Sequence, residues 1–174
     1  MKCYIMANKK TLIAIVGPTA VGKTTMAISL AQYFKTAIIS ADSRQFYREM
    51  SIGTAKPDLE ELHAAPHYFI DSHTITQDYS AGDFEREALQ KLEELFQLHE
   101  VVIMVGGSGL FVRALCEGLD DLPKAGDEVR ERLNHELATN GLEVLKDRLK
   151  SIDPAYFETA DIDNPQRVVR ALEV

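Results

Sequence analysis

A glycine-bounded motif near the start of the chain constrains the fold more than any other feature. It fits the pattern G-x-x-x-x-G-K-[ST], with a strand-like apolar run at 12–16 before it and a helical pattern at 26–34 after it. In this context the two glycines let the backbone turn tightly, so that successive N–H groups and the helix N-terminus face phosphate oxygens. The sequence therefore predicts a cradle for a di- or triphosphate, formed by Gly17, Pro18, Thr19, Ala20, Val21, Gly22, Lys23 and Thr24.

Two side chains of this cradle carry chemistry of their own. Lys23 supplies a compact positive charge for phosphate oxygens, and the hydroxyl of Thr24 is a suitable ligand for Mg²⁺. We therefore expect Mg²⁺ as the cofactor, with Thr24 as its protein ligand.

The positions of carboxylates along the chain limit the reactions that it could catalyse. The apolar run at 37–39 leads into Asp42, which would emerge beside the cradle if the two runs are neighbouring parallel strands. The run at 101–105, where an ATPase usually places an Asp for Mg²⁺, is followed instead by the glycine-rich segment 106–109. An ATP-hydrolysing motor is therefore disfavoured, whereas a nucleoside or nucleotide kinase stays open.

Composition bounds the class of protein. The chain has 174 residues, 45% of them hydrophobic, which suffices for one full core and an accessory element. Its two cysteines, Cys3 and Cys116, show no metal-ligand spacing, and no apolar run reaches transmembrane length. We expect a reduced cytoplasmic protein without a membrane partner, and a monomer.

Charge is distributed unevenly along the chain. The net charge of −8 argues against a general nucleic-acid binder. However, residues 1–58 hold eight Lys and Arg against three Asp and Glu, whereas residues 59–174 hold eleven against twenty-four. The basic part contains the cradle, which suits a polyanionic ligand there, although chance variation in surface charge explains the asymmetry equally well.

The order of patterns predicts an α/β fold, a P-loop NTPase-like three-layer parallel sheet with a small helical insertion. A short strand is expected at 68–70, and Ser80 with Asp83 forms an imperfect capping box at the start of a helix. Acidic helices are expected at 127–139 and 142–152, and Asp-Pro and Asn-Pro pairs begin two more. The predicted division is a P-loop α/β core at 1–116, a helical insertion at 117–163 and a return helix of the core at 164–174.

Six segments, read in order, resemble the motif series of the tRNA dimethylallyltransferases. Each motif is weak alone, but the ordered set is specific to that family. The resemblance implies transfer of a dimethylallyl group from dimethylallyl diphosphate to N6 of the adenosine at tRNA position 37, next to the anticodon. It also implies that the family's C-terminal third is absent here, so that the chain alone binds tRNA poorly. The segments are 17–24, 40–47, 52–57, 66–67, 105–111 and 164–173.

The resemblance also implies residue roles. The cradle holds the diphosphate leaving group, Lys23 neutralises its growing charge, and Asp42 is the general base. Ser108 stands where the family commonly has Thr and keeps the hydroxyl, while Phe111 replaces a frequent Tyr. The implied catalytic residues are Asp42, Lys23 and Ser108, and the implied tRNA contacts are Asp42, Ser43, Arg44, Gln45, Ser108, Arg130, Gln166, Arg167, Val168, Val169 and Arg170.

Other interpretations stay open at this point. Asp42 also suits a position around Mg²⁺ or at a helix cap, 43–45 suits a solvated loop, and the arginines suit plain solvent exposure. The runner-up function is a P-loop nucleoside or small-metabolite kinase that binds ATP, and the third is a nucleotide-binding module without activity. The absent Asp after Val105, the loop at 52–57 and the polar helix face at 166–170 favour the prenyltransferase.

Overall fold

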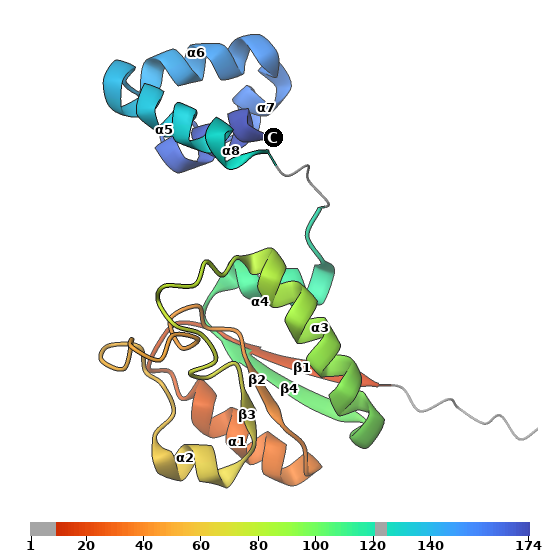
Figure 1. The fold of residues 1–174 in the computed structure, drawn as a ribbon. Coiled ribbons are helices and arrows are strands. Elements are labelled where there is room, and N and C mark those ends of the chain that lie inside the picture. Colours follow the sequence, from red (N-terminus) through yellow and green to blue (C-terminus); the bar gives the residue numbers. More distant parts are fainter. Residues whose placement is uncertain (1–9, 121–124) are drawn as a thin grey trace, which may run out of the picture. The chain divides into compact units, whose positions relative to one another are not determined.

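The computed structural model describes residues 10–120 and 125–174. The chain forms two compact units, Met1–Leu119 and Asp120–Val174, and each is described by itself (Figure 1). None of the helices in the described part of the chain combines the length and hydrophobicity that a membrane crossing requires.

A parallel sheet forms the centre of the first unit. Its strands lie in the order β1 (Thr11–Val16), β4 (Val101–Gly106), β2 (Ile38–Ser40) and β3 (His67–Tyr68). Pairing aligns Val16 with Gly106, and Val105 with Ser40. The segments that follow β1, β2 and β4 therefore leave the sheet at one edge, as the expected parallel arrangement requires.

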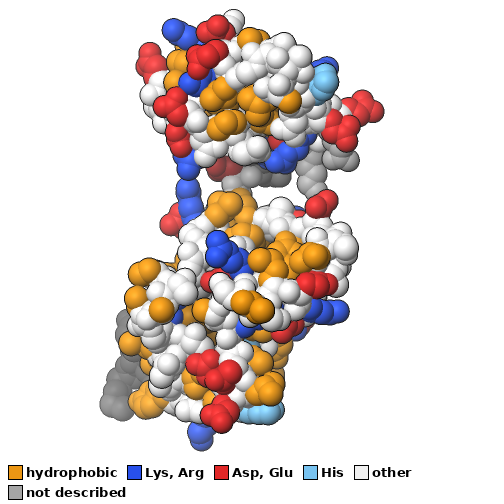
Figure 2. Space-filling view, turned by 90° about the vertical axis from the view of Figure 1, so that its left-hand side faces the viewer, with side chains coloured by type: hydrophobic (Ala, Val, Ile, Leu, Met, Phe, Trp, Pro, Cys, Tyr) orange, Lys and Arg blue, Asp and Glu red, His pale blue; other side chains and the backbone are white. Residues whose placement is uncertain are grey.

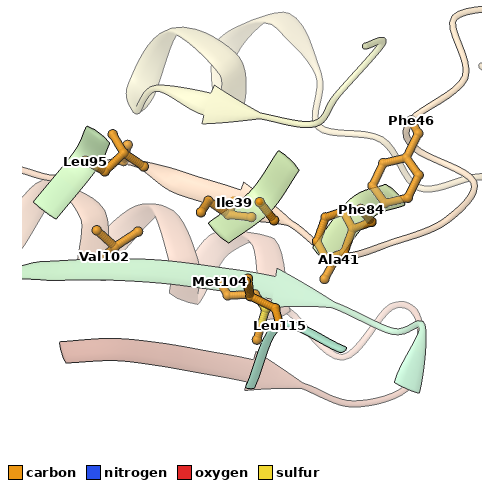
Figure 3. Close-up of a cluster of buried hydrophobic side chains, with 10 residues drawn as sticks. Ile39, Ala41, Phe46, Phe84, Leu95, Val102, Met104 and Leu115 are labelled. Atoms are coloured by element: carbon orange, nitrogen blue, oxygen red, sulfur yellow. The ribbon is translucent and has the colours of Figure 1, made fainter. Parts of the chain in front are cut away.

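Helices cover both faces of this sheet (Figure 1), namely α1 (Lys23–Phe34), α2 (Leu59–Ala64), α3 (Ala81–Leu98) and α4 (Gly109–Glu117). Alternation along β4 explains the two cores. Val102 and Met104 pack with α3 and α4, whereas Ile103 and Val105 pack with α1. Figure 3 shows the first of these clusters, with Leu95 and Leu115 from the two helices. Burial of each such side chain contributes about 1.5–3 kcal/mol. The predicted three-layer α/β fold is confirmed, with one hydrophobic core on each face of the sheet.

Three local features refine the expected elements. The capping box is complete, because Ser80 and Asp83 each accept a hydrogen bond from the other's backbone N–H. The hydrogen bonds from Ser80 also lower the pKa of Asp83. The strand expected at 68–70 ends earlier, since Phe69 adopts a left-handed φ of 64° that breaks the extended backbone. Helices α2 and α4 were not expected from the sequence.

The second unit is built from α5 (Asp127–Asn140), α6 (Leu142–Ile152), α7 (Pro154–Thr159) and α8 (Pro165–Glu173). Asp153 and Asn164 accept backbone hydrogen bonds at the starts of α7 and α8, as the Asp-Pro and Asn-Pro pairs predicted. The division drawn from the sequence assigned 164–174 to the catalytic core. In the structure α8 packs against α5 and α6, because its apolar face completes their small core, whose buried members are Leu133, Leu145, Leu149, Val168 and Val169.

Candidate functional site

The phosphate cradle is the loop between β1 and α1. Its backbone takes left-handed or strained angles, with φ of 86° at Gly22 and 67° at Ala20. Gly22 caps α1 without any side chain that could satisfy the first N–H groups of the helix. Those groups are therefore available to an anion. Lys23 folds back over the loop and donates to the carbonyl oxygen of Pro18 at 2.6 Å, which uses one of the three donors of its ammonium group.

Asp42 lies beside this cradle, just beyond the end of β2. Its Oδ1 accepts a hydrogen bond from the backbone N–H of Arg44 at 3.1 Å, which orients the carboxylate. A glycine makes this close approach of β2 and β4 possible: a Cβ on Gly106 would lie 2.4 Å from the carbonyl oxygen of Ala41. The expected position of Asp42 at the sheet edge is thus the observed one.

Two hollows of about 300 Å³ each meet at Asp42. Asp42 and Thr19 line both of them. The first hollow also contains Lys23 and Thr24 of the cradle, and the second contains Ser108. A phosphorylated donor in one hollow and an acceptor in the other would both touch the same carboxylate, which is the arrangement that a proton-coupled group transfer requires.

Ser108 ties the end of β4 to the loop after β2. Its Oγ accepts from the backbone N–H of Ser43 at 2.9 Å, and it donates to Ser43 Oγ at 3.1 Å. The structure therefore places Asp42, Ser43 and Ser108 together in the second hollow, and Arg44 lies exposed at its rim.

Gln45 has a different environment from the one expected. Its side-chain carbonyl accepts from Ser40 Oγ at 2.9 Å, and its amide donates to the carbonyl oxygens of Thr54 and Ala55 at 3.3 and 2.9 Å. The residue is 9% exposed. Since both ends of the amide are bonded within the protein, Gln45 anchors the loop at 50–57, and its contact with RNA stays a prediction.

Two further residues of the first hollow were not expected there. Lys56 is nearly buried and donates to the Tyr47 carbonyl oxygen and to Asp71 Oδ1. His67 Nδ1 lies 2.8 Å from the Ala65 carbonyl oxygen, and burial lowers the pKa of this imidazole. This contact ties the imidazole to the backbone just before β3. The sequence signals for Lys56 were its place in a Gly- and Pro-containing loop and in the motif segment 52–57.

The arginines of the helical unit form ion pairs. Arg130 and Arg170 lie 3.8 and 3.2 Å from the carboxylate of Glu173, whose side chain is only 8% exposed. Arg167 lies 3.6 Å from Asp161. On the face drawn in Figure 2, basic and acidic side chains of this unit are intermixed. The guanidinium groups of Arg130 and Arg170 thus converge on one buried carboxylate. The two arginine side chains are each about half exposed, and each has N–H donors that do not contact this carboxylate.

Two implied tRNA contacts are not on the surface. Val168 and Val169 are each 1% exposed and belong to the hydrophobic core of the helical unit. Their side chains pack α8 against α5 and α6, so contact of these two residues with RNA stays an untested prediction. Gln166 lies exposed at the start of the same helix and stays a prediction.

Comparison with known proteins gives the family. The family model described as IPP transferase matches residues 45–174, which is most of the chain. The chain belongs to the IPP transferase family. The resemblance drawn from the motif series is thereby confirmed.

Relatives in this family carry matching names. The chain is 55% identical over 163 residues to a tRNA dimethylallyltransferase of Christiangramia forsetii, covering 94% of this chain and 54% of the relative. It is 50% identical to tRNA dimethylallyltransferase 1 of Bacteroides fragilis, covering 95% and 55%. The chain therefore spans about half the length of these IPP transferase relatives.

Solved structures agree with the fold. The full-length tRNA isopentenylpyrophosphate transferase of Bacillus halodurans superimposes with a TM-score of 0.63 at 38% identity, covering 95% of this chain and 55% of that one. A eukaryotic dimethylallyltransferase acting on tRNA gives a TM-score of 0.79 at 28% identity, covering 95% and 41%. The P-loop α/β architecture is thus that of other IPP transferases.

Proposed function

We propose that the whole protein is a tRNA dimethylallyltransferase, which transfers a dimethylallyl group from dimethylallyl diphosphate to N6 of the adenosine at tRNA position 37, next to the anticodon. The single observation that carries this proposal is that Asp42 lines both hollows. The phosphate cradle lies in the hollow on one side, and the hydroxyls of Ser43 and Ser108 lie in the hollow on the other. Two of the relatives support this proposal by their names, tRNA dimethylallyltransferase and tRNA dimethylallyltransferase 1.

The reaction then follows from the positions of these groups. The lone pair of N6 attacks the allylic carbon, and the carbon–oxygen bond breaks so that its electron pair goes to the diphosphate. The N6 proton passes to the carboxylate of Asp42, giving an alkylated amine and a free diphosphate. Oδ1 of Asp42 is held by Arg44 N–H, so Oδ2 is the oxygen left to take the proton.

The cradle binds and stabilises the leaving group. Lys23 and the N–H groups at the start of α1 face the oxygens on which charge grows as the bond breaks. Removing such preorganised donors from an enzyme typically costs about 10²–10³-fold in rate. Lys23 therefore contributes to both binding and catalysis in this proposal.

The residues present fit a magnesium ion. In the described residues no cluster of three or more His, Cys, Asp or Glu could hold a metal by itself. Mg²⁺ in phosphate sites, however, needs only one or two protein oxygens besides phosphate and water. Thr24 offers its hydroxyl in the first hollow, close to the cradle. When bound there, the ion would neutralise part of the diphosphate charge.

The acceptor must leave its base stack to reach Asp42. Chemistry on an adenine amine requires extrusion of the base into a pocket. The second hollow suits this role, because Ser43 and Ser108 offer hydroxyls, and Arg44 lies exposed at its rim for a phosphate. Arg130, Gln166, Arg167 and Arg170 supply further polar contacts on the helical unit. We also propose that the protein works in the cytoplasm, where its tRNA substrate is, and that it works as a monomer.

The test uses the whole protein with labelled dimethylallyl diphosphate, Mg²⁺ and bulk tRNA. The expected result is label in tRNA, recovered after nuclease digestion as an adenosine alkylated at N6. A parallel reaction contains ATP labelled on its terminal phosphate together with free nucleosides. Phosphoryl transfer in that reaction, with none of the prenyl label in RNA, would overturn the proposal in favour of the kinase.

A further inference from the structure

Lys56 occupies an unusual place for a lysine. Its side chain is 9% exposed, although lysine is almost never buried unless it is paired. It lines the same hollow as Lys23 and Thr24, yet it comes from the loop at 50–57 and not from the cradle. A second positive charge therefore stands in the diphosphate hollow.

The ammonium group of Lys56 is held from two sides. It donates to the Tyr47 carbonyl oxygen at 2.5 Å and to Asp71 Oδ1 at 2.6 Å. An ammonium group has three N–H donors, so one remains. The two hydrogen bonds fix the position of the ammonium group, because they join Lys56 to Tyr47 on one side and to Asp71, which follows β3, on the other.

The backbone on both sides of the Lys56 ammonium group adopts uncommon angles. Ala55 and Asp71, on its two sides, have left-handed φ angles of 49° and 51°, which residues other than glycine adopt only when neighbouring contacts impose them. The amide of Gln45 supplies such a contact by donating to the Ala55 carbonyl oxygen. The lysine is thus preorganised before any ligand binds.

The charges lining the first hollow show why a second cation matters. Among the described residues these are Lys23 and Lys56 on the positive side and Asp42 and Glu61 on the negative side. Glu61 is occupied, because its carboxylate accepts from the Asp58 backbone N–H at the start of α2. A diphosphate carries several negative charges, and Lys23 alone matches only a part of them.

We propose that Lys56 is a second diphosphate-binding residue, whose remaining N–H donates to an oxygen of the diphosphate held by the cradle. Tyr47 and Asp71 orient the ammonium group for this contact. The inference rests on the proposed function, since it concerns the leaving group of that reaction. As charge grows on the diphosphate, the contact strengthens, so Lys56 supports the rate as well as binding.

The experiment separates this role from that of a structural clamp. Pyrophosphate with Mg²⁺ is titrated calorimetrically into the whole protein and into three variants, and the unfolding temperature of each is measured. Lys56→Met removes the charge at similar length, Asp71→Asn weakens the clamp but leaves the ammonium group, and Lys23→Ala removes the charge of the cradle. We expect Lys56→Met to weaken pyrophosphate affinity about tenfold or more, and Asp71→Asn to change it less than about threefold.

Each outcome has one meaning. Two results would overturn the inference: wild-type pyrophosphate affinity in Lys56→Met, or equal losses of affinity and unfolding temperature in Lys56→Met and Asp71→Asn. In both cases a loss of affinity in Lys23→Ala would still show that the cradle binds diphosphate. Unchanged affinity in Lys23→Ala as well would count against the proposed function itself. If Lys56→Met does not fold, Lys56→Gln replaces it with the same two outcomes, because its amide is uncharged but keeps N–H donors. Recovery of affinity in Lys56→Arg would support the inference.

Discussion

Replacing Gly106 with alanine would place a methyl group against the backbone of Ala41, the residue that follows β2. The new Cβ would lie 2.4 Å from the carbonyl oxygen of Ala41 and 2.5 Å from its carbonyl carbon. Both are backbone atoms, so no side chain can rotate away. The two strands must separate by about 1 Å to reach an ordinary contact distance.

The size of the effect follows from what that separation disturbs. Forcing an extra methyl into a packed region typically costs about 1–3 kcal/mol. The hydrogen bond from Ala41 N–H to the Val105 carbonyl oxygen, 2.8 Å long, would also weaken, at about 0.5–1.5 kcal/mol. Asp42 is the next residue along the chain, and a displacement of about 1 Å in a reacting group can reduce the rate about 10²-fold. We therefore expect a loss of about 1.5–4.5 kcal/mol in stability, combined from these two ranges, and about 10²-fold in rate.

The assay pairs calorimetric unfolding with single-turnover transfer of labelled dimethylallyl groups by the whole protein. Gly109→Ala is the matched control, because a Cβ there meets no atom within 4 Å and its backbone is helical. It should leave stability unchanged or raise it slightly. If Gly106→Ala unfolds and reacts like the wild type, the contact between the strand ends does not hold Asp42 in place.

The first part of the site could be predicted from the sequence because its determinants are local. A strand, a glycine-bounded loop and a helix follow one another within 11–34, and the structure forms β1, the cradle and α1 there. The position of Asp42 needed one additional rule, that parallel strands end at the same edge of a sheet. The pairing of Ser40 with Val105 satisfies that rule.

The parts that were missed depend on contacts between distant residues or on single backbone angles. Lys56 reaches Asp71 across fifteen positions of sequence, which no periodic pattern encodes. Helix α4 begins inside the glycine-rich run at 106–109, and glycine is a poor helix former. The burial of Val168 was visible in the apolar period of the last helix, but the role implied by the family resemblance set it among the RNA contacts. The apolar spacing accounts for the packing of this residue, whereas its contact with RNA stays a prediction.

Three further perturbations test the proposed chemistry and RNA contacts. Asp42→Asn should keep pyrophosphate affinity but lower the single-turnover rate by about 10²–10⁴-fold, and an unchanged rate would exclude it as the base. Ser108→Ala should slow transfer because the hydroxyl that bonds Ser43 is lost, whereas Ser108→Thr, which keeps it, should stay near the wild-type rate. Glu173→Gln removes the buried charge that draws Arg130 and Arg170 together. Both guanidinium groups then repel each other and become freer, so tRNA affinity in the whole protein should fall severalfold although the protein becomes less negative. Filter binding at several salt concentrations measures this, with Arg130→Ala as the reference variant, which should reduce the slope of log affinity against log salt by up to about 0.9. A rise in affinity in Glu173→Gln would show that the carboxylate competes with phosphate for the arginines, and that their pairing does not serve to position them for RNA.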